Sequence, residues 1–247
     1  MSSLLPCRSA RYKLGGMSIT TNEPSSVIVS LTSWRGRIFS EIVQLVLFSL
    51  LKQKTKYRYK VVLVLSTDEF PKKEAELPAN IVKMAELVPN FSLLWTVKNT
   101  KALKKLDPTM AAYPDLPVIT TDDDIIVKDD FVESFMEMHN RYPKDTIYAY
   151  MFDFPGNPEI KISGWGRLFP PHSLYPLDEK LFDKCFHGVE DDVWNGIRVW
   201  IAGTKVRKLG AWPFVKQIPI GDTAFSNQYL KINPVICYRQ LMKELAK

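Results

Sequence analysis

Short runs of apolar, largely β-branched residues recur through the first half of the chain, and segments with helical patterning separate them. The clearest runs are residues 27–32 (VIVSLT), 59–66 (YKVVLVLS) and 117–121 (PVITT), which indicate buried strands. Residues 38–52, between the first two runs, have the spacing of an amphipathic helix. Because strands that alternate with helices form mostly parallel sheets covered by helices, this pattern predicts an α/β fold.

Weaker patterns continue the alternation along the rest of the chain. We expect further strands near residues 81–84, 91–97 and 147–152. We expect helices over residues 100–106, where Pro108 would stop the helix, and over 129–141, 189–202, 223–231 and 238–246.

The chain divides into a short leader and one domain. Residues 1–25 have no periodic pattern and are interpreted as a loose leader, and residues 26–247 are long enough for a single domain with its own core. The half 26–152 carries the strand–helix alternation. The half 153–247 is less regular and contains four of the six tryptophans, which are Trp165, Trp194, Trp200 and Trp212.

The composition excludes several classes of protein. Hydrophobic residues make up 46% and charged residues 24%, which argues against disordered, collagen-like and coiled-coil chains. The net charge of +6 suits anionic partners such as nucleotide phosphates or an anionic membrane surface. The basic residues do not interleave with aromatic residues on a recognisable nucleic-acid module, so we expect no nucleic-acid partner.

Cysteine usage and hydropathy indicate the compartment. The three cysteines, Cys7, Cys185 and Cys237, are odd in number and far apart, which argues against a disulfide framework or a zinc ribbon and favours a reducing compartment. No run approaches the roughly 20 apolar residues of a membrane span. We therefore expect a cytoplasmic protein that can rest peripherally on the inner face of the membrane.

Three acids, Asp122, Asp123 and Asp124, directly follow the predicted strand 117–121. The carboxyl end of a strand is where ligands bind in open α/β sheets. Three adjacent carboxylates repel one another, and a divalent cation such as Mn²⁺ or Mg²⁺ removes that cost. In an extended segment Asp122 and Asp124 point the same way, so they are the expected metal ligands. A solvated acidic turn is the alternative.

A second acidic group, Glu190, Asp191 and Asp192, opens the predicted helix 189–202. Acids are routine in a first helical turn because they complement the helix dipole. A partly desolvated carboxylate is also what a general base for a hydroxyl nucleophile requires. His187 lies three residues before Glu190 and is a candidate third metal ligand.

Basic residues precede or follow the predicted strand ends. Arg37 follows the first strand, and Lys104 and Lys105 precede the acidic strand. Cations in these places can bind a diphosphate, although lysines of this kind also form solvated helix faces. The sequence contains no P-loop, no Gly-x-Gly-x-x-Gly and no Ser/His/Asp nucleophile pattern.

In this order, the segments resemble the GT-A glycosyltransferases, over about residues 27–233. The resemblance rests on five groups of residues: Thr32-Ser33 with Arg37; Lys104-Lys105-Leu106, Tyr113-Pro114-Asp115 and residues 118–124, an order similar to bacterial surface-polysaccharide transferases; residues 164–171 (GWGRLFPP); Asp191-Asp192-Val193-Trp194 with Ala202-Gly203; and residues 221–228 (GDTAFSNQ). Glu190-Asp191 and Asp191-Asp192 are competing alignments of the acidic catalytic motif, and the spacing to Arg198 and Gly203 favours the second.

The resemblance implies a metal-dependent transferase that moves a sugar from a nucleotide diphosphate sugar, with UDP favoured, to a glycan or lipid-linked acceptor in cell-surface polysaccharide synthesis. It implies Mn²⁺ or Mg²⁺ on Asp122 and Asp124. Donor binding would fall to Thr32, Arg37, Lys104, Lys105, Asp122 and Asp123. Asp192, or else Asp191, would be the base, with inversion at the anomeric carbon and a retaining outcome left open. The alternatives are a sugar-phosphate nucleotidyltransferase and a non-catalytic carbohydrate-binding protein.

Overall fold

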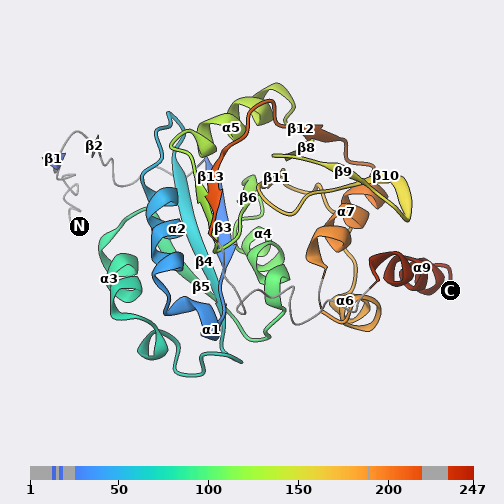
Figure 1. Ribbon diagram of the computed structural model, residues 1–247, viewed down its shortest axis with the longest axis horizontal. Coiled ribbons are helices and arrows are strands. Elements are labelled where there is room, and N and C mark those ends of the chain that lie inside the picture. The colour runs from blue at the N-terminus through green and yellow to red at the C-terminus, as the bar shows by residue number, and fades with distance from the viewer. Residues whose placement is uncertain (1–12, 15–16, 19–25, 189, 219–232) are drawn as a thin grey trace, which may run out of the picture.

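The computed structural model describes residues 13–14, 17–18, 26–188, 190–218 and 233–247. Its centre is a seven-stranded sheet with strand order β12-β8-β11-β6-β3-β4-β5 (Figure 1). The strands are β3 (Val27–Thr32), β4 (Tyr59–Ser66), β5 (Phe91–Thr96), β6 (Val118–Thr120), β8 (Thr146–Tyr148), β11 (Arg167–Phe169) and β12 (Val206–Lys208). The predicted α/β fold with a mostly parallel sheet is therefore confirmed.

The apolar runs of the sequence form the parallel centre of this sheet. Strand β3 pairs in parallel with β4 on one side and with β6 on the other, and β4 pairs in parallel with β5. Side chains on both faces of β3 and β4 are buried, as their continuous apolar sequences require. Strand β11 is the exception, because it runs antiparallel to both β6 and β8.

Helices cover both faces of the sheet. The buried side chains of α2 (Glu41–Leu51), α3 (Ala79–Leu87) and α5 (Phe131–Arg141) share one core with Val27, Val29 and Leu31. On the opposite face, Ile28 and Val62 share a core with residues of α4 (Asp107–Ala112) and α7 (Asp191–Ile201). Short helical segments precede these: α1 (Arg35–Ile38), the 3₁₀ helix η1 (Lys73–Glu76) and the 3₁₀ helix η2 (Lys101–Lys105).

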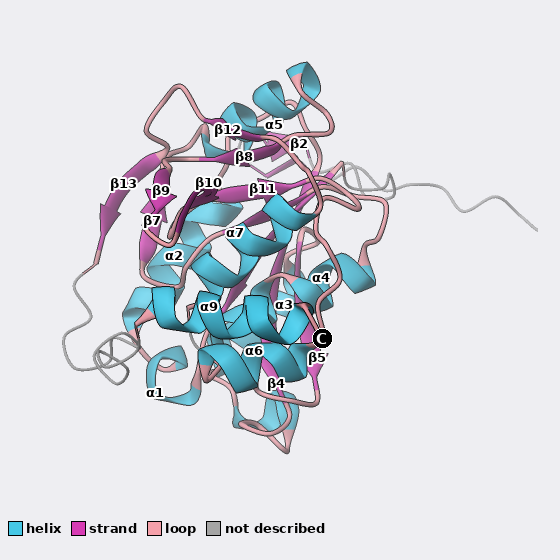
Figure 2. Ribbon diagram, turned by 90° about the vertical axis from the view of Figure 1, so that its right-hand side faces the viewer, coloured by secondary structure: helices cyan, strands magenta, loops and turns pink. Residues whose placement is uncertain are grey.

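A further core forms where α6 (Glu179–Phe186), α7 and α9 (Pro234–Leu245) lie together (Figure 2). A small antiparallel ribbon, β9 (Phe152–Phe154) with β10 (Asn157–Ile162), belongs to this core, whereas a second ribbon, β7 (Ile125–Val127) with β13 (Phe214–Gln217), packs in the core of α2 and α5. In the part of the chain that the structure describes, no helix combines the length and apolar character needed to span a bilayer.

Two local predictions were wrong, and two others lie wholly or mostly outside the described residues. Residues 81–84 are helical within α3, with Ile81 buried, so a short apolar run was mistaken for a strand. Pro108 does not end a helix but stands in the first turn of α4, where its missing N–H costs nothing. The predicted helix 223–231 and nearly all of the predicted leader lie outside the described residues; strands β1 (Lys13–Leu14) and β2 (Met17–Ser18) pair with each other.

Helix α7 packs against β10 through a glycine. A Cβ atom on Gly196 would lie 2.7 Å from the carbonyl oxygen of Lys161 and 2.8 Å from Cγ2 of Ile162. The bare backbone thus allows the helix to approach the strand, and this approach fixes the position of the acids at the start of α7.

We predict that Gly196→Ala destabilises the protein, although helix propensity alone favours alanine by about 1 kcal/mol. The new methyl group meets backbone rather than a flexible side chain, so we expect the free energy of unfolding to fall by about 1–3 kcal/mol. Denaturant titration measures this. Gly210→Ala, where a Cβ would meet nothing within 4 Å, is the matched control. A more stable Gly196→Ala variant would contradict the packing argument.

Candidate active site

The predicted acidic strand end lies where the strand order of the sheet reverses. Strands β3 and β6 are parallel neighbours, and the chain goes outward from β3 through β4 and β5 on one side and through β6 on the other. Ligands of open α/β sheets bind beyond the carboxyl ends of strands at such a point. Here Ser33, just after β3, donates a hydrogen bond of 2.5 Å from Oγ to Oδ2 of Asp123, just after β6. The two strand ends are therefore joined side chain to side chain.

Asp123 is directed into the protein. It forms an ion pair with Arg37 of α1, and both side chains are only 7% exposed. Burial raises the pKa of Asp123 to about 6, against the opposing influence of Arg37 and Ser33. These contacts fasten α1 to the strand end, so Arg37 and Asp123 form a buried support under the site.

Lys105 connects the two acidic segments that the sequence singled out. Its Nζ lies 2.6 Å from Oδ1 of Asp122 and 3.3 Å from Oδ2 of Asp191, with only 4% of the side chain exposed. Burial disfavours the ammonium, but Asp122 and Asp191 outweigh it and raise the pKa of Lys105, which stays protonated. The strand end and the start of α7 thus share one cation.

Arg167 of β11 is a site residue that the sequence reasoning missed. Its side chain is 1% exposed, with Nη2 3.1 Å from Oδ2 of Asp191 and Nη1 2.9 Å from Oδ1 of Asp192. The available signal was a charged residue inside the apolar segment Arg-Leu-Phe (167–169), because a charge in a buried strand requires a partner of opposite charge.

Asp191 and Asp192 are adjacent in sequence but differ in environment. Asp191 is buried, which favours its neutral form, yet Lys105 and Arg167 outweigh burial and lower its pKa. The Asp192 side chain is 35% exposed, and burial together with Asp191 raises its pKa to about 7. Glu190 is exposed and has a left-handed backbone with φ of 65°. Of these acids, Asp192 is the one suited to exchanging a proton near neutral pH.

Asp124 contacts strand β13 of the ribbon that β7 and β13 form. Its Oδ2 accepts a hydrogen bond of 3.2 Å from Gln217 Nε2, and burial, followed by the charge of Asp122, raises its pKa. Asp122 and Asp124 are thus close enough to interact electrostatically. Mn²⁺ and Mg²⁺ are commonly bound by one or two such carboxylates together with diphosphate oxygens. The oxygen donors of Asp122 and Asp124 are of the kind that these ions accept, but among the described residues no group of three or more His, Cys, Asp or Glu side chains is gathered to hold a metal ion.

The structure corrects one premise of the sequence argument. The three adjacent acids do not depend on a metal ion alone to relieve their repulsion, since Lys105 pairs with Asp122 and Arg37 pairs with Asp123.

Three other predicted site residues make their contacts elsewhere. Lys104 Nζ lies 2.8 Å from Glu69 Oε2 and 2.7 Å from Asn99 Oδ1, and the hydroxyl of Thr32 donates to the carbonyl oxygen of Val64 at 2.7 Å. His187 is exposed at the end of α6 with φ of 53°. The segment 221–228 lies outside the described residues.

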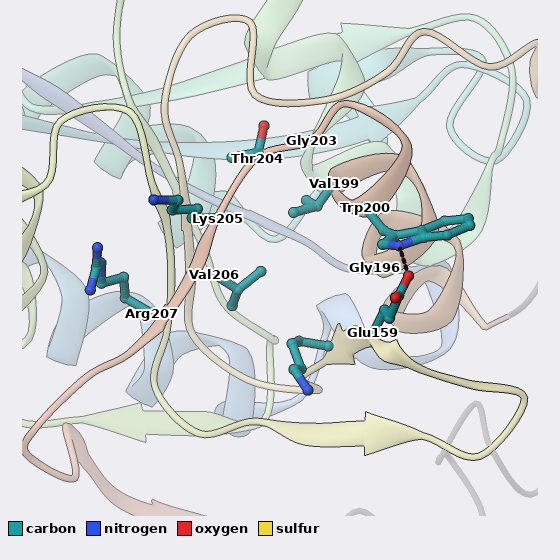
Figure 3. Close-up of a pocket in the computed structure, with 10 residues that line it drawn as sticks. Glu159, Gly196, Val199, Trp200, Gly203, Thr204, Lys205, Val206 and Arg207 are labelled. Atoms are coloured by element: carbon teal, nitrogen blue, oxygen red, sulfur yellow. Dashed lines mark hydrogen bonds between the residues drawn. The ribbon is translucent and has the colours of Figure 1, made fainter.

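A cavity of about 610 Å³ lies along the second half of α7, away from the acids that open this helix (Figure 3). It lies between Trp200 of α7, whose indole N–H donates to Glu159 at 3.0 Å, and the segment of Lys205 and Arg207. None of its lining residues belongs to the acidic site, so the chemistry described above does not use it.

The fold resembles those of solved glycosyltransferase structures. The mannosyltransferase PcManGT of Pyrobaculum calidifontis, solved with GDP-Man and Mn²⁺, superposes with a TM-score of 0.52 at 15% identity, over 81% of this chain and 59% of that one. TarS 1–349 of S. aureus, solved with UDP-GlcNAc, superposes with a TM-score of 0.53 at 12% identity, over 81% of this chain and 61% of that one.

The likeness shows that the chain has a GT-A-like fold, and the chain spans about three fifths of the length of each neighbour. By sequence, the chain matches no family model and no curated protein.

We predict that Asp191→Asn destabilises the protein by about 3 kcal/mol, because removing one charge of a buried pair leaves its partners uncompensated. Lys105 and Arg167 would both lose an anion at 3.3 and 3.1 Å. The free energy of unfolding from denaturant titration measures this. Glu190→Gln, an exposed acid beside Asp191, is the control. A loss below about 0.5 kcal/mol, the usual range of a surface change, would contradict a structural role for the pair.

Proposed function

We propose that this protein is a glycosyltransferase that moves a sugar from a nucleotide diphosphate sugar to a glycan or lipid-linked acceptor. One observation carries the proposal: Lys105 and Arg167 join the strand-end acid Asp122 to the helix-start acid Asp192 through Asp191. The acids proposed for donor binding and for proton transfer thus belong to one cluster, on a GT-A-like sheet and at the point where such sheets bind ligands, which supports the proposal.

Asp122 and Asp124 would hold a Mn²⁺ or Mg²⁺ ion together with oxygens of the donor diphosphate. When bound, that ion supplies positive charge that stabilises the departing nucleoside diphosphate. Of the cations proposed to assist the phosphates, Lys105 is the best placed, since its ammonium already lies against Asp122. Lys104 is committed to Glu69, and Arg37 supports Asp123.

Asp192 would remove the proton from the acceptor hydroxyl. Nη1 of Arg167 forms an ion pair with Oδ1 of this carboxylate at 2.9 Å, while the Asp192 side chain remains partly open to solvent. Attack by the deprotonated hydroxyl on the face opposite the diphosphate would invert the anomeric carbon.

We predict that nucleoside diphosphate binding depends on a divalent cation and on Asp124. Asp124→Asn removes one carboxylate from the proposed ligand pair, so we expect metal-dependent affinity to fall at least about tenfold, or about 1.4 kcal/mol. Calorimetry with UDP or GDP, with and without EDTA, measures this. Asp129→Asn is the control, because Asp129 pairs with Lys52 and Lys54 on the surface. Equal affinity with and without metal would contradict the proposal.

A panel of nucleotide sugars incubated with Mn²⁺ tests the reaction class. Release of nucleoside diphosphate from one donor above the others is the expected result. Release of pyrophosphate from a nucleoside triphosphate and a sugar phosphate would instead indicate a nucleotidyltransferase, and sugar binding with neither product a non-catalytic protein.

We predict that Asp192→Asn lowers transfer to acceptor by about 10²- to 10⁴-fold while donor binding survives. Asp192 lies in the first turn of α7 rather than at its N-cap, and asparagine keeps its shape but not the charge that pairs with Arg167, so unchanged donor binding is the check that Asp192→Asn remains folded. Because a base must be ionised and burial raises the pKa of Asp192 to about 7, the wild-type transfer rate should fall as the pH drops below about 7.

Rate–pH profiles at saturating donor test this, and Glu190→Gln separates the two alignments of the acidic motif. We expect Glu190→Gln to keep the wild-type profile. Transfer by Asp192→Asn within about threefold of wild type would exclude Asp192 as the base.

A further inference from the structure

Four aromatic side chains gather on the surface beside Asp192, and we call them the aromatic patch: Tyr150, Phe152, Trp165 and Trp212. Tyr150 is the hub, with its ring centroid 5.8 Å from Trp165, 5.8 Å from Trp212 and 6.3 Å from Phe152, the last in a stacked arrangement. Phe152 is 51% and Trp212 48% exposed. Exposed aromatic faces held rigidly against one another are typical of ligand-binding surfaces.

Tyr150 connects the aromatic patch to the proposed base. Its hydroxyl oxygen accepts a hydrogen bond of 3.0 Å from the backbone N–H of Gly164. A Cβ atom on Gly164 would lie 2.7 Å from this oxygen and 3.3 Å from Oδ2 of Asp192. The bare Cα of Gly164 therefore lies against both oxygens, and the place where the Tyr150 hydroxyl and the Asp192 carboxylate approach each other across this glycine is here called the Gly164 notch.

The two oxygens of Asp192 have different surroundings. Oδ1 is the oxygen that lies 2.9 Å from Nη1 of Arg167. Oδ2 is the oxygen that faces the Gly164 notch. The side of Asp192 that lies toward Tyr150, the hub of the aromatic patch, is therefore its Oδ2 side.

We propose that the acceptor is a sugar residue whose ring stacks on the aromatic patch while its reacting hydroxyl binds to Oδ2 of Asp192 at the Gly164 notch, an inference that rests on the proposed glycosyltransferase function. The patch offers apolar faces to the C–H groups of a sugar ring, and the notch offers the Tyr150 hydroxyl and the Asp192 carboxylate to its hydroxyl groups. A hydrocarbon chain in the same place would give the Tyr150 O–H and Oδ2 of Asp192 no hydrogen-bond partner in exchange for the water it displaces, which is costly.

In the transfer step, the acceptor O–H bond breaks and its proton passes to Oδ2 of Asp192. The acceptor oxygen forms a bond to the anomeric carbon of the donor. The bond from that carbon to the diphosphate oxygen breaks, and the nucleoside diphosphate leaves with the electron pair.

The test uses Trp212→Ala and Phe152→Ala, with Phe48→Ala as the control because Phe48 is 64% exposed on α2. The acceptors are methyl and octyl glycosides of glucose, galactose, mannose, N-acetylglucosamine and rhamnose, with glycerol as a polyol without a ring. We expect Trp212→Ala and Phe152→Ala to raise the acceptor KM at least about tenfold, Trp212→Phe to restore part of it, and Phe48→Ala to change nothing.

Gly164→Ala probes the notch separately. The added methyl group would crowd Tyr150 and Asp192 Oδ2, so we expect kcat for transfer to fall while donor hydrolysis by water is retained. If the KM is lower for octyl than for methyl glycosides, and Trp212→Ala raises both, the acceptor sugar is lipid-linked. If the KM values of octyl and methyl glycosides are equal, the acceptor is a free glycan. Both results support the sugar subsite.

Donor hydrolysis without acceptor separates the two proposals. Absence of any donor turnover in the wild type would overturn the glycosyltransferase proposal, and with it the transfer step. With donor turnover intact, an unchanged acceptor KM in Trp212→Ala and Phe152→Ala, or transfer to glycerol in preference to every glycoside, would overturn the sugar subsite. Quenching of tryptophan fluorescence by the methyl glycosides gives an independent measure of binding, which Trp212→Ala should weaken.

Discussion

A row of alternating charges holds this molecule together at its site: Asp122, Lys105, Asp191, Arg167 and Asp192, of which the three in the middle are buried. A charge removed from water is stable only beside a partner of opposite sign. Each member therefore constrains its neighbours, and the row runs from the strand-end loop of the first half of the chain to β11 and α7 of the second. The same ion pairs therefore set the geometry of the site and hold the two halves of the chain together.

The same row gives the adjacent acids Asp191 and Asp192 different pKa values. Asp191 lies between Lys105 and Arg167 and is held ionised, which leaves Asp192 as the acid whose pKa is raised. Pairs of titratable groups whose environments push their pKa values apart are a recurrent basis for acid–base chemistry. Tyr150 and the Gly164 notch then connect Asp192 to the aromatic patch. The Asp192 carboxylate thus has a cationic neighbour, a raised pKa and an aromatic surface close by.

Local patterning predicted the elements whose sequence has a single reading. The runs 27–32 and 59–66 are too apolar and too short for anything but buried strands, and they are β3 and β4. Residues 81–84 were ambiguous, because a short apolar run fits a strand or one turn of a helix, and packing of Ile81 decided for the helix. Pro108 was misread for a related reason: a proline can stand just past the end of one helix or in the first turn of the next, and its identity alone does not distinguish the two positions.

The sequence by itself determined the fold class and identified the acids at 122–124 and 191–192 as candidate site residues, since both signals lie in contiguous segments of the chain. Only the tertiary structure decided how these acids are used. The sequence suggested Lys105 as a cation for phosphates but gave no sign that it bridges Asp122 and Asp191, and it did not mark Arg167 as a site residue. The physical reason is that an ion pair depends on distance in space, and the antiparallel insertion of β11 beside β6, which brings Arg167 to the acids, leaves no periodic mark in the sequence.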